Sequence, residues 1–167
     1  MRLKRKLLDG IKLKHVFTLL YFLCFFVYLV VGLSPAKAAE YEAATEIKIP
    51  AIGLVSDVVT LHVQDNTLPT PDEIVGRYTV TPHKTLLIGH SATVFQRLGE
   101  IRNGDTIYYD DTTYMVTHRQ TYLRENIVMK DLLAAAEKDT IVIMTCAGQD
   151  LGGGEATHRL IVTAVAE

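Results

Sequence analysis

Short runs of β-branched and aromatic residues, separated by turn-forming residues, recur through most of this chain. Such runs are typical of β-strands, and about eight of them within some 120 residues leave little room for long helices. So many short strands favour a closed or nearly closed, antiparallel-rich barrel, because closure pairs the strand edges. The predicted strands are Ile47–Ile49, Val58–Val63, Tyr78–Val80, Leu86–Ile88, Thr106–Tyr109, Tyr114–Thr117, Ile141–Thr145 and Leu160–Val165.

Helix is expected only as a minor component. Met129–Lys138 is the best candidate, because Leu132, Leu133 and Ala136 can share one face of a helix. Phe95–Ile101 is expected to add one or two turns. We therefore expect a mainly β fold with eight strands and one or two short helices.

The N-terminal part of the chain has the composition of a membrane anchor. Basic residues precede a charge-free apolar run over residues 16–33, which is nearly long enough to cross a bilayer core at about 1.5 Å per residue. Flanking positive charge keeps such an N-terminus in the cytoplasm. We predict a cytoplasmic basic segment (1–15), a transmembrane signal-anchor (16–33), a linker (34–45) and an extracellular domain (46–167) of a cell-membrane protein with a single span.

Cleavage after Ala38 is the alternative for this segment. Ala36-Lys37-Ala38 resembles a signal-peptidase site, which would release the domain from the membrane. The apolar run is longer than the usual signal core of about 7–15 residues, so the uncleaved anchor is favoured.

The folded part is acidic. Residues 39–167 carry ten basic and eighteen acidic side chains, although the net charge of the whole chain is only −2. Nucleic-acid binding needs a concentrated positive surface to neutralise phosphates, so we expect no nucleic-acid partner. A body of roughly 130 residues suits one domain with one core.

Three chemically complementary side chains stand at the ends of predicted strands. Leu86–Ile88 runs into Gly89 and His90, Ile141–Thr145 runs into Cys146, and Arg159 precedes Leu160–Val165. If these strands are neighbours, an imidazole, a thiol and a guanidinium meet at one edge of the barrel.

This combination fits nucleophilic catalysis on a peptide carbonyl. Cys146 is the only cysteine outside the apolar run, and its thiol can form a thioester. His90 can take up and return protons, while Arg159 has up to five donors for an oxygen that becomes negative. Taken singly, each residue is usually structural or solvated, so the combination carries the prediction.

The same residues resemble the signatures of the sortase family. Gly89-His90, Thr145-Cys146 and Arg159 followed by Leu160-Ile161-Val162 are similar to the three sortase motifs in their order along the chain. The segment from Ile47 to Gly53 also resembles the opening strand of sortase domains, and Gly104-Asp105 a turn in that family. The resemblance implies an eight-stranded sortase-type β-barrel, and it gives no subclass.

The resemblance also implies an activity. Sortases cleave a Leu-Pro-x-Thr-Gly-like sorting motif, hold it as a thioester on the cysteine, and transfer it to an amine on a peptidoglycan precursor or a pilin lysine. By this analogy His90, Cys146 and Arg159 would be catalytic, whereas Thr145 and Ala147 would contact the substrate, Thr145 by helping to bind the oxyanion. A cell-surface cysteine endopeptidase with the same triad and a non-catalytic envelope binding domain are the alternatives.

Other candidate sites are weaker. His158 is the main rival of His90, but it should point to the face of its strand opposite to that of Arg159. His62, His83 and His118 are expected at the surface or rim, and Leu68-Pro69-Thr70-Pro71 is expected to be a loop. We expect no cofactor and no metal site, because one cysteine and scattered histidines do not make a zinc site. Asp110-Asp111, or Asp150 with Glu155, could bind calcium, although solvated loop carboxylates are the simpler interpretation.

Overall fold

The computed structural model describes residues 43–65, 67–152 and 155–167, which belong to a compact unit spanning Tyr41–Glu167. The predicted basic segment, membrane anchor and cleavage site lie outside the described residues. Among the residues that are described, none of the helices has the length and apolar character needed to cross a membrane.

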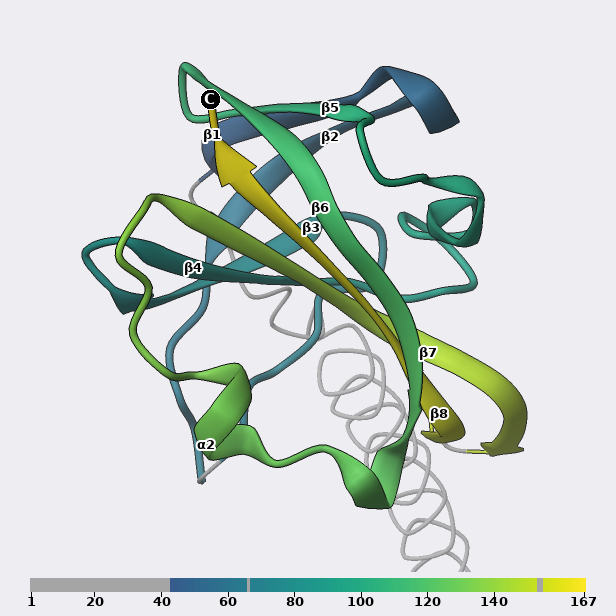
Figure 1. Cartoon of the computed structure of the whole chain (residues 1–167). Helices are drawn as coiled ribbons and strands as arrows, with labels where there is room; N and C mark the ends of the chain where they lie inside the picture. Colours follow the sequence, from purple (N-terminus) through teal and green to yellow (C-terminus); the bar gives the residue numbers. More distant parts are fainter. Residues whose placement is uncertain (1–42, 66, 153–154) are drawn as a thin grey trace, which may run out of the picture. The chain divides into compact units, whose positions relative to one another are not determined.

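The described unit is a closed eight-stranded barrel (Figure 1). Its strands follow the order β1-β2-β3-β4-β7-β8-β6-β5, and the pairing of β5 with β1 closes it. The pairs β2–β3 and β4–β7 are parallel, and the other pairs are antiparallel. The strands are β1 (Ala43–Ile49), β2 (Leu54–Thr60), β3 (Val75–Thr81), β4 (Lys84–Ile88), β5 (Thr106–Tyr109), β6 (Thr112–Leu123), β7 (Thr140–Gly152) and β8 (Glu155–Ala166).

All eight predicted strands are present, but several have different limits. β1 begins at Ala43, inside the segment expected to be the linker, and β2 ends at Thr60 although a strand was predicted as far as Val63. β6 is longer than predicted because its pairing with β8 continues as far as Leu123↔His158. Residues 117–121 of β6 are exposed, so this extension has no buried face that a sequence pattern could reveal.

The predicted helix at Met129–Lys138 is too long. α2 covers only Met129–Leu132, and it lies in the connection between β6 and β7. The carbonyl of Ala134 accepts a hydrogen bond of 2.8 Å from Lys84 Nζ on β4, and the chain then leads to the start of β7 at Thr140. Single 3₁₀ turns occur at η1 (Pro50–Ile52), η2 (Leu98–Glu100) and η3 (Arg124–Asn126), and η2 accounts for part of the predicted Phe95–Ile101 turns.

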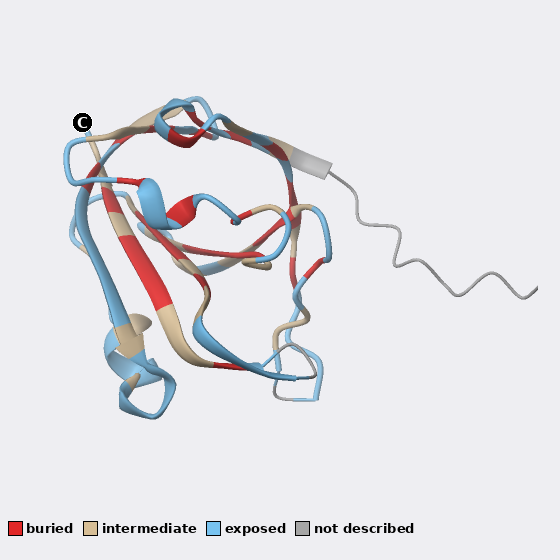
Figure 2. Ribbon diagram, turned by 90° about the vertical axis from the view of Figure 1, so that its right-hand side faces the viewer, coloured by how far each residue is buried: buried red, intermediate tan, exposed pale blue. Residues whose placement is uncertain are grey.

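Two hydrophobic clusters cover opposite faces of the strands. Burial is concentrated along the strands, whereas the connecting segments are mostly exposed (Figure 2). The interior cluster contains Ile47, Ile49, Ile52, Val58, Val75, Leu87, Phe95, Leu98, Ile101, Ile107, Tyr109, Tyr114, Val116, Ile141, Ile143, Leu160, Val162 and Ala164. The outer-face cluster contains Val59, Leu61, Leu86, Ile88, Val142 and Ile161.

Segments outside the strands cover part of the outer-face cluster. Leu68 and Ile74 pack on it from the connection between β2 and β3, and Ile127, Leu132 and Leu133 from the connection that carries α2. Both faces of the β4–β7–β8 sheet are therefore apolar. The interior is closed mainly by strands, with Phe95, Leu98 and Ile101 added from the connection between β4 and β5.

Candidate active site

The three strand ends that carry the predicted chemistry are neighbours in the barrel. β7 lies between β4 and β8, with Ile88 opposite Met144 and Cys146 opposite Arg159. His90, two residues beyond β4, lines the same cavity of about 510 Å³ as Cys146 and Arg159. The structure thus brings the imidazole, the thiol and the guanidinium together at one edge of the sheet, as the sequence predicted.

Strand alternation places the thiol on the outer face. Successive side chains of a strand point to opposite faces, so Cys146 shares its face with Val142 and Met144, whereas Ile143 and Thr145 face the interior. Val142 belongs to the outer-face cluster and Ile143 to the interior cluster, which agrees with this assignment. Cys146 is half-buried and therefore accessible from the cavity.

His90 is held in place by the residues on either side of it. A Cβ on Gly89 would lie 2.5 Å from Val94 Cγ1 and 2.9 Å from Phe95 Cδ2, so only glycine permits the turn after His90 to pack this closely. The Gly89 carbonyl accepts a hydrogen bond of 2.7 Å from Thr145 Oγ1, and the His90 carbonyl accepts one of 3.0 Å from the Phe95 amide. Close packing therefore explains why glycine precedes histidine in this motif.

Asp72 is a site residue that the sequence analysis missed. Its Oδ1 lies 3.7 Å from His90 Nε2, and the side chain of Asp72 is 97 % exposed. Thr93 Oγ1 donates a hydrogen bond to the Asp72 carbonyl, which ties this loop to the turn after His90. No strand periodicity connects positions 72 and 90, so no sequence pattern signalled the contact.

Arg159 is the most enclosed charged group of the site, since its side chain is only 16 % exposed. Its Nη1 donates hydrogen bonds of 3.0 Å to the carbonyls of Ala156 and His158, and its Nη2 lies 3.3 Å from Glu155 Oε2. A guanidinium has five N–H donors, so these bonds fix its orientation without using its full capacity.

Thr145 and Ala147 flank the thiol in different ways. Thr145 is buried at 4 % exposure, and its single hydroxyl proton is donated to Gly89. Ala147 packs against the interior cluster. In this structure Thr145 joins β7 to the end of β4, while substrate contact by either residue stays a prediction.

The other histidines lie apart from this arrangement. His158 Nδ1 is 2.8 Å from Thr157 Oγ1, and it packs against Gly148, where a Cβ would lie 2.5 Å from it. His158 alternates with Arg159 along β8, so it faces the other side of the strand, as expected. His62, His83 and His118 are exposed.

The cavity around Cys146 is an apolar groove with a polar end. Its floor is formed by Leu86, Ile88 and Met144, and its walls include Leu68, from the predicted loop, and Met129 on α2. Farther along the same outer face lies a second cavity of about 380 Å³. Its lining consists of Lys84, His118, Tyr122, Asn126, Ile127, Val128, Asp131, Leu132, Val142, Ile161 and Thr163.

The two cavities lie several residues apart along β7, a distance that an extended peptide could span. Four residues of strand separate Val142, in the second cavity, from Cys146, which corresponds to about 13 Å. An extended chain bound along this face would place a residue about four positions from the one at Cys146 in the second cavity.

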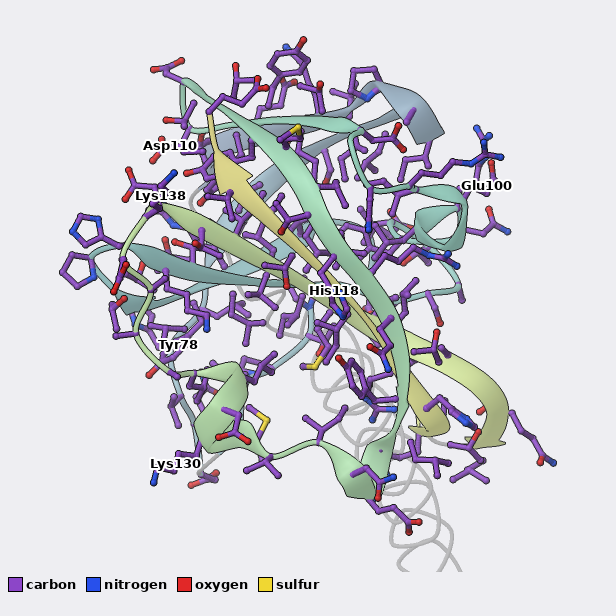
Figure 3. The ribbon with its side chains drawn as sticks, in the orientation of Figure 1. Tyr78, Glu100, Asp110, His118, Lys130 and Lys138 are labelled. Atoms are coloured by element: carbon purple, nitrogen blue, oxygen red, sulfur yellow. The ribbon has the colours of Figure 1, made fainter. Side chains whose placement is uncertain are left out.

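The candidate calcium ligands do not form a cluster. Within residues 43–65, 67–152 and 155–167, no group of three or more His, Cys, Asp or Glu side chains is placed to hold a metal ion. Asp110 and Asp111 form the tight turn between β5 and β6, with φ of 52° and 58°. Figure 3 shows Asp110 at one end of the barrel and Lys130 of α2 near the other.

Comparisons with known proteins agree with this architecture. The profile of one protein family, described as the Sortase domain, matches residues 47–167. A comparison with curated proteins found no match.

Solved structures with this fold include proteins of two sortase classes. A lid mutant of sortase A from Corynebacterium diphtheriae is 25 % identical, with a TM-score of 0.59, and the match covers 79 % of this chain and 74 % of that one. Sortase C-1 from Actinomyces oris is 24 % identical, with a TM-score of 0.56 and coverage of 74 % and 71 %. Sortase C1 from Streptococcus agalactiae is 20 % identical, with a TM-score of 0.60 and coverage of 78 % and 74 %. Because both classes occur, the neighbours do not assign a subclass.

Proposed function

Since the chain belongs to the sortase family, we propose that it is a cysteine transpeptidase that cleaves a Leu-Pro-x-Thr-Gly-like sorting motif and transfers it to an amine. The observation that carries the proposal is the pairing of Cys146 with Arg159, with His90 in the same cavity. These three side chains come from separate segments of the chain, and each supplies one function that thioester chemistry needs.

The first half-reaction forms the thioester. The Cys146 thiolate attacks the carbonyl carbon of the motif threonine, and the carbonyl oxygen becomes negatively charged. Arg159 donates hydrogen bonds to this oxygen, and loss of such a donor typically raises the barrier by about 3–4 kcal/mol. When the C–N bond breaks, protonated His90 gives its proton to the glycine amine, which leaves.

The second half-reaction regenerates the Cys146 thiolate. An incoming amine attacks the thioester carbonyl carbon, His90 takes the proton from the amine, and the C–S bond breaks to leave an amide and the Cys146 thiolate. We propose a peptidoglycan precursor or a pilin lysine as the source of the amine.

The apolar groove supports a short, extended, largely apolar motif as the substrate. Leu86, Ile88 and Met144 offer an apolar floor next to Cys146, and the second cavity begins about four residues away. In an extended chain, a leucine that precedes the reacting threonine by three positions would lie over the apolar floor, about one residue short of the second cavity.

Two other functions remain as competing outcomes. A cell-surface endopeptidase would use the same three residues but transfer the acyl group to water. A non-catalytic binding domain would keep its ligand affinity and its phenotype when Cys146 is replaced by alanine.

Intact-protein mass spectrometry distinguishes these functions. We would mix the full-length protein with a small library of Leu-Pro-x-Thr-Gly-like peptides and a glycine-rich amine, with Cys146→Ala as the matched control. Transpeptidation predicts an acyl adduct on Cys146 that the amine converts to an amide. Mainly hydrolysed product in abundant amine would indicate an endopeptidase, and absence of any adduct would reject thioester chemistry on these peptides.

We also propose that residues 16–33 anchor the protein in the cell membrane, with residues 1–15 in the cytoplasm and the barrel outside. The basic residues before this apolar run support that orientation. External protease should then digest the barrel of intact cells, and the N-terminal mass of the purified protein should include residues 1–38. An N-terminus at Ala39 would instead indicate cleavage after Ala38.

A further inference from the structure

Three charged side chains form a cluster at the edge of the cavity, and two of them, Glu155 and Arg159, line it. The Glu155 carboxylate, at the start of β8, contacts both Arg159 on the same strand and Arg124 at the start of η3. Glu155 and Arg124 are each 52 % exposed, whereas Arg159 is 16 % exposed. One carboxylate therefore joins the guanidinium of the active site to the connection that leads to α2.

The charges of this cluster do not cancel. Two guanidinium groups and one carboxylate leave a net charge of about +1, because arginine remains protonated in proteins. If Glu155 had Arg159 as its only cationic partner, the carboxylate would turn fully toward the guanidinium and offset its charge. A shared carboxylate holds Arg159 but interacts with it less strongly.

The sharing of the Glu155 carboxylate matters because Arg159 must meet two requirements that conflict. Its Nη1 is fixed by the Ala156 and His158 carbonyls, so Nη2 is the end that Glu155 reaches. A donor that stabilises an oxyanion must be oriented in advance, but its positive charge must remain effective at the reacting atoms. Glu155 alone would improve the orientation of Arg159 but weaken the positive potential that Arg159 exerts at the reacting atoms.

We propose that Glu155 is a positioning residue for Arg159. We also propose that Arg124 partly neutralises the Glu155 carboxylate, so that Arg159 maintains a positive potential at Cys146. This proposal rests on the proposed function only in taking Cys146 and Arg159 as partners. Arg124 acts through Glu155, so removal of Arg124 matters only while the carboxylate is present.

The charge near Cys146 can be measured without a substrate. Iodoacetate and iodoacetamide alkylate the same thiolate, but only iodoacetate is negatively charged. The ratio of their rate constants at Cys146 therefore reports the positive potential at the thiol. The experiment uses the full-length protein, with peptide mass spectrometry to separate Cys146 from Cys24.

A double-mutant cycle tests the proposed order of action. Arg124→Gln should lower the iodoacetate-to-iodoacetamide ratio by about two- to fivefold, the range typical of partly exposed charges. Glu155→Gln should raise the ratio, and Arg124→Gln added to Glu155→Gln should change it little. Equal effects of Arg124→Gln in both backgrounds would mean that Arg124 acts directly through space, which would overturn the proposal.

A matched surface pair provides the control. Glu100 forms two hydrogen bonds with Arg97, and it lies in η2 on a different side of the barrel from α2 (Figure 3). Glu100→Gln should leave the ratio unchanged, and thermal unfolding of every variant would show that the barrel is intact. If Glu100→Gln moves the ratio as much as Glu155→Gln does, the effect is not specific to the cluster and the proposal fails.

The outcome is distinct from that of the peptide experiment. A non-additive cycle without any peptide adduct would support the cluster and reject thioester chemistry on the tested peptides. An adduct with an additive cycle would support the transpeptidase and reject the role of Arg124.

Discussion

Leu86 and Leu87 are neighbours on β4, and both are almost fully buried, yet they belong to different regions of the molecule. Leu87 lies in the closed interior of the barrel, where strands surround it. Leu86 lies on the outer face, where it lines the cavity with Cys146. Burial alone therefore does not distinguish residues that hold the fold together from residues that shape the site.

The difference follows from how each face is covered. The interior cluster is enclosed mainly by hydrogen-bonded strands, which are the most stable elements of a barrel. The outer-face cluster depends on the β2–β3 and β6–β7 connections, which contribute Leu68 and Leu132. Loops that cover a site are drawn from the less stable parts of a protein, so a substrate can displace them at low cost.

The largest expected effect separates the two leucines. Leu87→Ala should lower the free energy of unfolding by about 2–5 kcal/mol, because it leaves a cavity that strands cannot fill. Leu86→Ala should cost less stability, because the loops above it can relax, but it should raise the KM for a motif peptide. Urea unfolding and steady-state kinetics on the same two variants measure both quantities. If both variants lose the same stability and have the same KM, the proposed difference between the two faces is wrong.

A smaller effect is expected from loss of the hydrogen bond between Thr145 and Gly89. Thr145→Val keeps the shape of the side chain but leaves the buried Gly89 carbonyl without its donor, which should cost about 1–3 kcal/mol. Because this bond fixes the residue before His90, kcat should also fall. Thr145→Ser retains the hydroxyl and should recover most of the activity. Wild-type activity in Thr145→Val would show that the bond does not position His90.

At the exposed rim the expected effect is smaller again. Asp72→Asn should reduce kcat/KM by about two- to fivefold, since exposed ion pairs contribute little. The reduction should shrink in about 0.5 M salt, where charges are screened over a few ångströms. Asp57→Asn, an exposed change on β2, is the control. A salt-independent loss would point to a steric rather than an electrostatic role for Asp72.

The smallest expected effect concerns the interior alone, at alkaline pH. Burial raises the pKa of Tyr109 above its ordinary value of 10.0, although the hydrogen bond to Arg77 opposes this shift. Above pH 10 the unfolded chain therefore loses this proton first, so the free energy of unfolding should fall as the pH rises. Tyr109→Phe should reduce that dependence in urea titrations at several pH values. An unchanged pH dependence would mean that Tyr109 ionises equally in both states.

Most of the fold was predictable because the strands have one or two buried faces. Ile141–Thr145 and Leu160–Val165 are apolar runs, and both lie within longer strands, the first near the start of β7 and the second in the C-terminal half of β8. His90, Cys146 and Arg159 became the candidate residues because each stands next to such a run. Their convergence required only that β4, β7 and β8 be neighbours, which the register confirms.

The remaining features depend on contacts that leave no local pattern. The helix at Met129 stops early, where the Ala134 carbonyl bonds to Lys84 on a distant strand. Asp72 and Glu155 approach the site from segments whose sequence shows only ordinary surface carboxylates. Tertiary geometry, rather than propensity, decides such cases.

The bond between Thr145 and Gly89 joins residues that are 56 positions apart in the sequence. Contacts of such long range form slowly, because the intervening chain must first lose conformational entropy. Arg159 arrives later still during synthesis, on β8, which must insert between β7 and β6. In a partly synthesised or partly folded chain, the surroundings of Cys146 therefore differ from those in the finished barrel. The onset of Cys146 reactivity can accordingly serve as a kinetic marker for completion of the barrel.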